Sequence, residues 1–565
     1  MKSTRRTFLQ NTSLLAAALP LANFKLTAAG APAPASPAAA VPTSGVLREV
    51  LFSPGNITEQ KNCYDRFELL KKPAGNPVMT ASMPWEGGGG INWGSVIRSQ
   101  VDGKFKFFYN TDFPGAQEGA VLVDNSMQGK NHCVVCYAES DDGLTWRRPA
   151  LNLYFQDQFP GNNIIFAWAS YYNDASTVIE DLIEPDPARR YKMSMFHIDT
   201  KDHDLTGVCL FVSPDGLRWT FTGTVLPSQD ASSIWQDKRT GRYYAFLKDR
   251  HAGNRSRMLT YSDDFRNWSE PQWIFTPDHG DNEGTNFYNQ SAFTLGGRTL
   301  GFLNLYDLST QTTWVELIES GDNINWRRMP SRPHLLSPGA PGTYDSGGAY
   351  VGLAEPILVG DEYRYYYYAS ADRHDAADTG GNPAQRPSLA YATFRKDRLV
   401  GQQTEHDGYF VTLPFKCPGG RLFLNFVCRG EVTVSIKRPG YGNDYEGFTL
   451  AESVPVTGDH LRQEIVWKHH ANLDALKGKY IRIKVAGKNV IGYTAAFEVD
   501  RVAAALNGTY RRSPKAVTPD TVYCLRGRVR PPSFARTTEG RPDGPRTAGA
   551  RQTARPEAWP RHIFR

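Results

Sequence analysis

The sequence lacks a hydrophobic run long enough to cross a membrane. A spanning helix needs about 20 consecutive apolar residues, and the apolar run near the start, residues 14–19, is far shorter. A Walker phosphate loop, a His-Glu-x-x-His zinc motif and a Ser-His-Asp signature are also absent. We therefore expect a soluble mature protein without a membrane span, whose chemistry depends on none of these three motifs.

Cysteine is scarce, with seven among 565 residues. Cys133 and Cys136 form a Cys-x-x-Cys pair, but they lie in a strand-like run in which residues three apart point to opposite faces. No second Cys or His pair follows at the spacing of zinc ligands. We therefore predict that both are small core residues, and we expect no metal site and no cofactor. A structural calcium ion in a central channel stays open.

The first 30 residues have the pattern of an export signal. A basic start that contains Arg5 and Arg6 is followed by Phe8-Leu9, the short apolar run and small residues around Ala28. The paired arginines resemble a twin-arginine signal. We therefore expect a signal peptide over residues 1–30 and export to the periplasm or the medium. An Ala/Pro-rich linker should follow over residues 31–50.

The positive net charge is confined to the two ends of the chain. Residues 511–565 carry nine net positive charges and the signal region carries four, whereas the whole chain is +6. The remaining body is therefore about −7 and should repel nucleic acid. Residues 506–565, rich in Arg, Pro and Gly without an apolar period, are expected to be a disordered basic tail.

One motif recurs at identical internal spacing and predicts the fold. Ser-x-Asp-x-x-x-Trp begins at Ser140, Ser213, Ser262 and Ser320, with 73, 49 and 58 residues between successive copies. Repeats of this length with strands and a Trp are typical of propeller blades. The Asp should cap backbone N–H groups of a hairpin turn, and the Trp should pack between blades.

Strand patterns around the motif complete the predicted architecture. Each copy has strand-like runs before and after it, and a fifth unit without the Trp follows at residues 347–399. We therefore predict an all-β protein with a five-bladed β-propeller over residues 51–404. Alternating strands without a helical period then predict a C-terminal β-sandwich over residues 405–500.

These features resemble the five-bladed propeller glycoside hydrolases, and in particular exported members similar to families 32 and 43. Phrases such as Ser213-Pro214-Asp215-Gly216-Leu217-Arg218-Trp219 carry the resemblance, which covers about residues 50–500. It implies a carbohydrate substrate and cleavage of a glycosidic bond. The fructosidase signature Trp-Met-Asn-Asp-Pro-Asn-Gly is absent, so the family's catalytic residues cannot be carried over by motif.

Candidate catalytic groups are acids at the starts of the innermost strands. In a propeller these strands converge on one axis, and glycoside hydrolysis usually needs one protonated and one ionised carboxyl group. An acid lies at or just before this position in every predicted blade. The candidates, in chain order, are Glu86, Asp174, Asp230, Glu283 and Asp345, of which Glu283 is the preferred acid.

Sugar binding also needs aromatic platforms and a cation. The candidates in or beside the same loops are Trp85, Trp93, Tyr288, Tyr344 and Arg250. Aromatic residues make up 12% of the chain, and most of them should be packing residues.

Three functional interpretations remain open. The leading one is an exported glycoside hydrolase that acts through paired carboxylates on a poly- or oligosaccharide. The second is a carbohydrate-binding propeller without catalysis, because one fold hosts many functions. The third is a sialidase-like enzyme, because residues 140–146 resemble a sialidase turn motif, although sialidases have six blades.

Overall fold

The computed structural model describes residues 45–87, 90–113, 132–167, 172–198, 203–374, 387–440 and 442–499. The predicted export signal over residues 1–30 and basic tail over residues 506–565 lie outside this part of the chain. The described residues are almost entirely strands, with short 3₁₀ turns such as η1 (Pro54–Asn56), η4 (Pro187–Arg189), η5 (His203–Leu205) and η8 (Asp474–Leu476). The predicted all-β class is confirmed.

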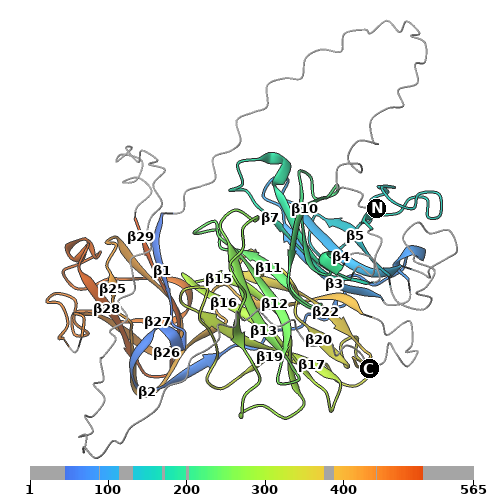
Figure 1. Cartoon of the computed structure of the whole chain (residues 1–565). Coiled ribbons are helices and arrows are strands. Elements are labelled where there is room, and N and C mark those ends of the chain that lie inside the picture. Colours follow the sequence, from blue (N-terminus) through green and yellow to red (C-terminus); the bar gives the residue numbers. More distant parts are fainter. Residues whose placement is uncertain are drawn as a thin grey trace, which may run out of the picture. The chain divides into compact units, whose positions relative to one another are not determined.

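Three four-stranded antiparallel meanders follow one another along the chain (Figure 1). Each begins with its innermost strand. The first contains β3 (Ile91–Arg98), β4 (Phe105–Phe113), β5 (His132–Ser140) and β6 (Ile164–Phe166). The second contains β7 (Tyr172–Glu180), β8 (Tyr191–Ile198), β9 (Gly207–Ser213) and β10 (Thr220–Leu226). The third contains β11 (Ser233–Gln236), β12 (Tyr243–His251), β13 (Asn254–Ser262) and β14 (Gln272–Phe275).

Two further meanders share one larger sheet. The fourth contains β15 (Thr285–Leu295), β16 (Arg298–Asp307), β17 (Thr312–Ser320), β18 (Trp326–Arg328) and β19 (His334–Leu336). The fifth contains β20 (Gly348–Tyr350), β21 (Ile357–Val359), β22 (Glu362–Ser370) and β23 (Ser388–Arg395). A single parallel bridge, Thr313 to Gly348, joins them. The strand pairing therefore separates five meanders.

An N-terminal segment supplies the outermost strand of the fifth meander. The Lys71 and Thr393 backbones exchange two hydrogen bonds of 2.9 and 2.8 Å, and Met79 pairs with Leu389 in the same antiparallel sense. The first meander then packs on the fifth, where the Leu353 N–H donates to the Gly94 carbonyl at 3.3 Å. The N-terminal segment and the first meander thus both contact the fifth meander, and these contacts close the ring of β-sheets that forms the propeller.

The repeated motif forms the turns that the sequence predicts. In the first copy, Asp142 Oδ1 accepts the backbone N–H groups of Leu144 and Thr145 at 2.7 and 2.8 Å. These bonds lower the pKa of Asp142 to about 2, because they stabilise the charged form. Ser140 Oγ accepts the N–H of Gly143 at 2.8 Å. The same contacts recur at Asp215, Asp264 and Asp322.

The motif tryptophans pack between neighbouring meanders. Trp219 of the second meander lies 6.5 Å from Phe108 of the first, and Trp326 of the fourth lies 5.5 Å from Phe246 of the third. Trp146 of the first meander contacts Tyr366 of the fifth at 6.2 Å between ring centroids. The repeat therefore also stabilises the contact that closes the ring.

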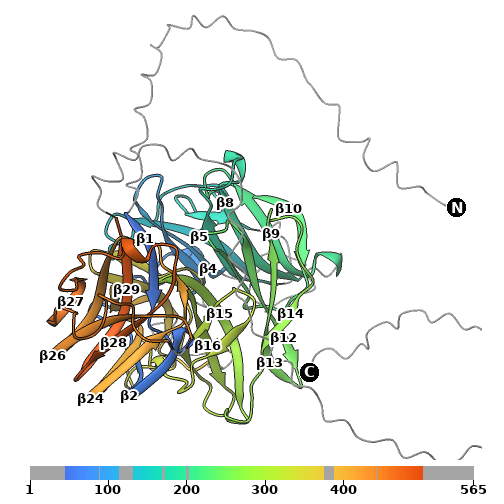
Figure 2. The ribbon, with the colours of Figure 1, turned by 90° about the vertical axis from the view of Figure 1, so that its left-hand side faces the viewer.

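The sandwich strands form one eight-stranded sheet with its own buried core. It contains β24 (Val400–Thr412), β25 (Phe415–Lys416), β26 (Arg421–Lys437), β27 (Val456–Ile465), β28 (Tyr480–Gly487) and β29 (Val490–Glu498). Two N-terminal strands complete it: β1 (Val46–Leu51) pairs with β29, and β2 (Ile57–Phe67) pairs with β24 (Figure 2).

These pairings differ from the predicted domain boundaries. The prediction ended a linker at residue 50 and began the propeller at residue 51, whereas residues 46–67 extend the sandwich sheet. Contacts between strands more than 300 residues apart in the sequence determine this arrangement, so local patterns do not reveal it. Within the described residues, no helix is long and apolar enough to cross a membrane.

Candidate functional site

Two predicted carboxylates occupy equivalent positions on neighbouring meanders. Asp174 lies in β7 and Asp230 just before β11, and each precedes an alanine with a left-handed backbone, Ala175 and Ala231, both at φ 52°. Asp174 Oδ1 accepts the N–H of Ala175 at 2.7 Å. An irregular register at this point of β7 interrupts the regular alternation of side chains. Both acids belong to the ends of the innermost strands where the sequence predicts the site.

Lys248 of β12 links these two acids. Its ammonium group forms an ion pair with the Asp230 carboxylate, and Asp174 also acts on it electrostatically. Burial nevertheless holds the pKa of Lys248 well below its usual value, and the positive charges of Arg255 and Arg257 lower it further. Lys248 was not among the predicted site residues. The feature that indicates it in the sequence is a charged residue directly after the apolar run of residues 243–247.

A third acid, Asp112, lies in the same region as Asp174, because both charges act on the Cys133 thiol. Asp112 is in β4 and accepts a hydrogen bond from the Cys133 thiol at 3.2 Å. After burial itself, the charges of Asp112 and Asp174 are the next causes that raise the pKa of the Cys133 thiol. The prediction of Cys133 and Cys136 as buried core residues is confirmed. Asp112 was missed because the search was confined to innermost strands.

Four aromatic rings pack together next to these acids. Trp93 of β3 stacks on Tyr288 of β15, with 5.5 Å between ring centroids and 19° between planes. Tyr350 of β20 and Tyr368 of β22 contact Trp93 edge-on at 5.9 and 5.4 Å. Asp174 raises the pKa of the Tyr288 and Tyr368 hydroxyls, in addition to burial. The hydroxyl groups therefore stay protonated and able to donate hydrogen bonds at neutral pH.

Arg255 completes the cluster from the β12–β13 hairpin. Its guanidinium group lies over the rings of Tyr288 and Tyr306, at 5.4 and 5.1 Å from their centroids. His374 Nε2 is 2.9 Å from the Tyr288 hydroxyl. We name this set the hub cluster: Asp112, Asp174, Asp230, Lys248, Arg255, Trp93, Tyr288, Tyr306, Tyr350, Tyr368 and His374.

Predicted Glu86 lies outside the hub cluster. It is in η2 (Pro84–Glu86) and fully buried, and its carboxylate accepts from Arg148 Nε at 2.6 Å and from the Tyr109 hydroxyl at 2.7 Å. Backbone N–H groups of residues 82 and 83 add bonds of 2.7 and 2.9 Å. These hydrogen-bond partners lie in the first meander and in the turn before it, so the structure gives Glu86 a packing role.

Predicted Asp345 is likewise held by the fold. It is buried and forms an ion pair with Lys72, and its Oδ2 atom accepts from the Tyr367 hydroxyl at 3.1 Å. The hydroxyl of predicted Tyr344 is 3.0 Å from the same Tyr367 hydroxyl. Lys72 adjoins the N-terminal segment that closes the ring, so this ion pair helps to fix the closure.

The other predicted residues divide between surface and core. Glu283 is exposed in the loop before β15. Arg250 is exposed in the β12–β13 hairpin and donates to the Gly253 carbonyl at 3.0 Å. Trp85 is buried, and its indole N–H donates to Asn163 Oδ1 at 2.6 Å. Of the ten predicted site residues, the structure thus brings Asp174, Asp230, Trp93 and Tyr288 together.

Two cavities lie away from the hub cluster. One, of about 430 Å³, is lined by the far ends of the innermost strands, including Ile97, Ile179 and Trp235. Its acids are bound within the fold: Glu180 accepts from the Ser99 hydroxyl at 2.7 Å, and Glu355 accepts from the Trp235 indole at 2.6 Å. We name this the distal cavity. Its lining mixes apolar residues with Arg98, Gln236 and Lys238, and its carboxylates have partners in the fold.

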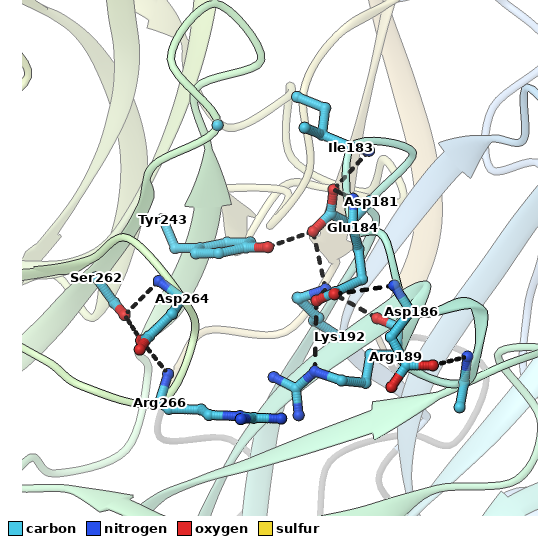
Figure 3. Close-up of polar contacts among 12 residues, drawn as sticks. Asp181, Ile183, Glu184, Asp186, Arg189, Lys192, Tyr243, Ser262, Asp264 and Arg266 are labelled. Carbon is cyan, nitrogen blue, oxygen red and sulfur yellow. Dashed lines mark hydrogen bonds and ion pairs between the residues drawn. The ribbon is translucent and has the colours of Figure 1, made fainter. Parts of the chain in front are cut away.

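The second cavity, of about 460 Å³, is lined by residues of the second and third meanders. Beside it, buried Lys192 bonds Asp181 at 2.8 Å and Glu184 at 3.1 Å, and the Tyr243 hydroxyl points at Asp181 (Figure 3). This network satisfies the charges it contains and joins the two meanders. Among the described residues, no group of three or more His, Cys, Asp or Glu side chains is placed to hold a metal ion.

No protein-family model matches the chain, and no curated protein matches it. It is similar to the solved β-1,2-mannobiose phosphorylase from Listeria innocua, at 12% identity and a TM-score of 0.41, over 58% of this chain and 96% of that one. It is also similar to a glycosyl hydrolase from Bacteroides ovatus, at 14% identity and a TM-score of 0.39, over 59% of this chain and 96% of that one.

A further similar structure belongs to the GH130 family of mannoside phosphorylases, described as containing glycoside hydrolases that target β-1,2 mannosidic linkages in Candida mannan. The identity is 15% and the TM-score 0.38, over 58% of this chain and 94% of that one. The solved structures named here are thus carbohydrate-active proteins, at levels of similarity that assign this chain to no one family.

Proposed function

We propose that this protein is an exported, carbohydrate-active enzyme that hydrolyses a glycosidic bond at the hub cluster. One observation carries the proposal: Asp230 pairs with a buried lysine on which Asp174 of the neighbouring meander also acts electrostatically, beside a group of aromatic rings. Glycoside hydrolysis needs two carboxyl groups with different protonation states, and aromatic rings suit the faces of sugars. Export rests on the pattern of the first 30 residues.

The two carboxyl groups have different surroundings, which supports different roles. Asp230 is paired with Lys248, and a neighbouring positive charge favours the ionised form. Asp230 is therefore suited to act as the base or nucleophile. Asp174 lies in the same region as Asp112, because both charges act on the Cys133 thiol. With Asp230 as the ionised group, we propose Asp174 as the acid that protonates the leaving oxygen.

Turnover of a panel of aryl glycosides and polysaccharides by the full-length protein tests the proposal. Asp174→Asn and Asp230→Asn should each lower kcat by about 10²- to 10⁴-fold, the usual range for losing a general acid or base. Glu283→Gln is the matched control, because Glu283 is an exposed acid outside the cluster. Equal activity of all three variants would contradict the proposal.

A carbohydrate-binding protein without catalysis is the second candidate. The placement of Glu86, Asp345 and Glu283 favours it, because three of the five expected acids lie outside the cluster. Calorimetric titration with the same saccharides separates the two functions. Binding without turnover, unchanged in Asp174→Asn, would support the second candidate.

A further inference from the structure

The positive charges of the hub cluster differ in how they are neutralised. Lys248 has Asp230 as its partner. Arg257 is fully buried and donates to the backbone carbonyls of Ala231 and Phe246 at 3.1 and 2.9 Å. Lys248 therefore has an ionic partner, and Arg257 has backbone acceptors although its Nε atom has none.

Arg255 has no such partner. Among the described residues, no carboxylate lies within ion-pair distance of its guanidinium group, and its Nε atom is buried without a hydrogen-bond acceptor. The rings of Tyr288 and Tyr306 hold the guanidinium group in place but accept no N–H bond. The Arg255 guanidinium group therefore has no ionic partner among the described residues, which suits a site where the ligand supplies a carboxylate.

Arg255 lies near two other cations. After burial, the charges of Arg255 and Arg257 are the next causes that lower the pKa of Lys248, so the three groups lie close together. A planar guanidinium group forms two parallel bonds with a carboxylate, and a fixed orientation reduces the entropy lost on binding.

We propose that the hub cluster recognises an acidic sugar, and that Arg255 binds the carboxylate of a uronic acid residue in the substrate. This inference rests on the proposed function, because it assigns the substrate class of the same site. Arg255 is then a specificity-determining residue. Asp174 and Asp230 keep their proposed roles at the glycosidic bond, and the Tyr288 ring contacts both Lys248 and Arg255.

Paired ligands that differ only in charge test the inference. Calorimetric titration of the full-length protein with oligogalacturonides and oligoglucuronides, each compared with its methyl ester, isolates the contribution of the carboxylate. The acid form of at least one pair should bind about 10- to 100-fold more tightly than its ester, as expected for a charge-assisted hydrogen bond. The preference should weaken as salt rises.

Arg255→Gln should abolish the difference between acid and ester, and Arg255→Lys should retain part of it. Arg250→Gln, the control on the paired position of the same hairpin, should retain all of it. Thermal unfolding verifies that each variant is folded. Equal binding of acid and ester, no binding of either acid, or a preference that survives Arg255→Gln would overturn the inference. Turnover of neutral glycosides that depends on Asp174 would then still support the proposed function.

Discussion

The two ends of the innermost strands carry different chemistry. At the starts, the hub cluster combines three acids, a lysine with a lowered pKa and an arginine that has no acidic partner in the described part of the chain. At the far ends, the distal cavity has a mixed polar and apolar lining, and Glu180 and Glu355 are bound by neighbouring side chains. The distal cavity and the hub cluster therefore occupy opposite ends of the same strands. We place the proposed site by charge and pairing, and not by cavity volume.

The largest predicted effect separates the two ends by activity. Asp174→Asn should lower kcat by about 10²- to 10⁴-fold, because it removes a group that transfers a proton. Glu355→Gln in the distal cavity should leave kcat within about twofold, because Glu355 bonds only groups of the fold. Steady-state kinetics on a common glycoside measures both. A large loss of kcat in Glu355→Gln with a small loss in Asp174→Asn would instead place the site in the distal cavity.

The next largest effect distinguishes acids that hold the fold from acids of the site. Asp345→Asn should lower the free energy of unfolding by about 3 kcal/mol, because it leaves Lys72 without its partner beside the ring closure. Asp174→Asn should lower it by about 1 kcal/mol. Denaturant unfolding measures both changes. A stable, inactive Asp345→Asn variant would instead place Asp345 in the site.

The lysine of the hub cluster predicts a pH dependence of stability. Burial lowers the pKa of Lys248 in the folded state, whereas the unfolded chain keeps a value of about 10.4. Between these values the unfolded state binds more protons, so the contribution of Lys248 to stability increases as pH rises. The unfolding free energy of wild type minus that of Lys248→Met should therefore increase from pH 7 to pH 10. A flat or falling difference would contradict the lowered pKa.

The smallest effect concerns the repeated turns, which belong to neither end. Asp322→Ala removes the cap of two backbone N–H groups and should cost about 1 kcal/mol of stability without changing kcat. Hydrogen bonds hold the pKa of Asp322 below its usual value. Its stabilising contribution is therefore present at neutral pH and is lost as pH falls through that lowered value. Thermal unfolding at pH 7 and pH 2.5 checks both statements.

Local chemistry explains what the sequence predicts well. The Ser-x-Asp-x-x-x-Trp motif contains its own turn, since Asp142 bonds residues two and three positions later, so the meanders follow from the sequence. Asp174 and Asp230 were found because each adjoins an innermost strand. Glu86 satisfied the same rule, yet its carboxylate bonds N–H groups of its own turn and Arg148, 62 residues away.

Long-range pairing explains what the sequence does not reveal. The outermost strand of the fifth meander comes from residues near 71–79, and two sandwich strands come from residues 46–67. Lys248 and Arg255 join the hub cluster from the second and third strands of a meander. Their contribution depends on how far the β12–β13 hairpin extends beside Tyr288 and Tyr306, which only the folded structure shows.

The central claim is that saccharides bind at the hub cluster and not in the distal cavity. A crystal structure of the Asp174→Asn variant, with an oligosaccharide that the wild type cleaves, tests it most directly. We predict a sugar ring in contact with Asp230 and Tyr288, with the bond to be cleaved next to residue 174. A sugar bound only against Trp235 and Glu355 in the distal cavity would contradict the account.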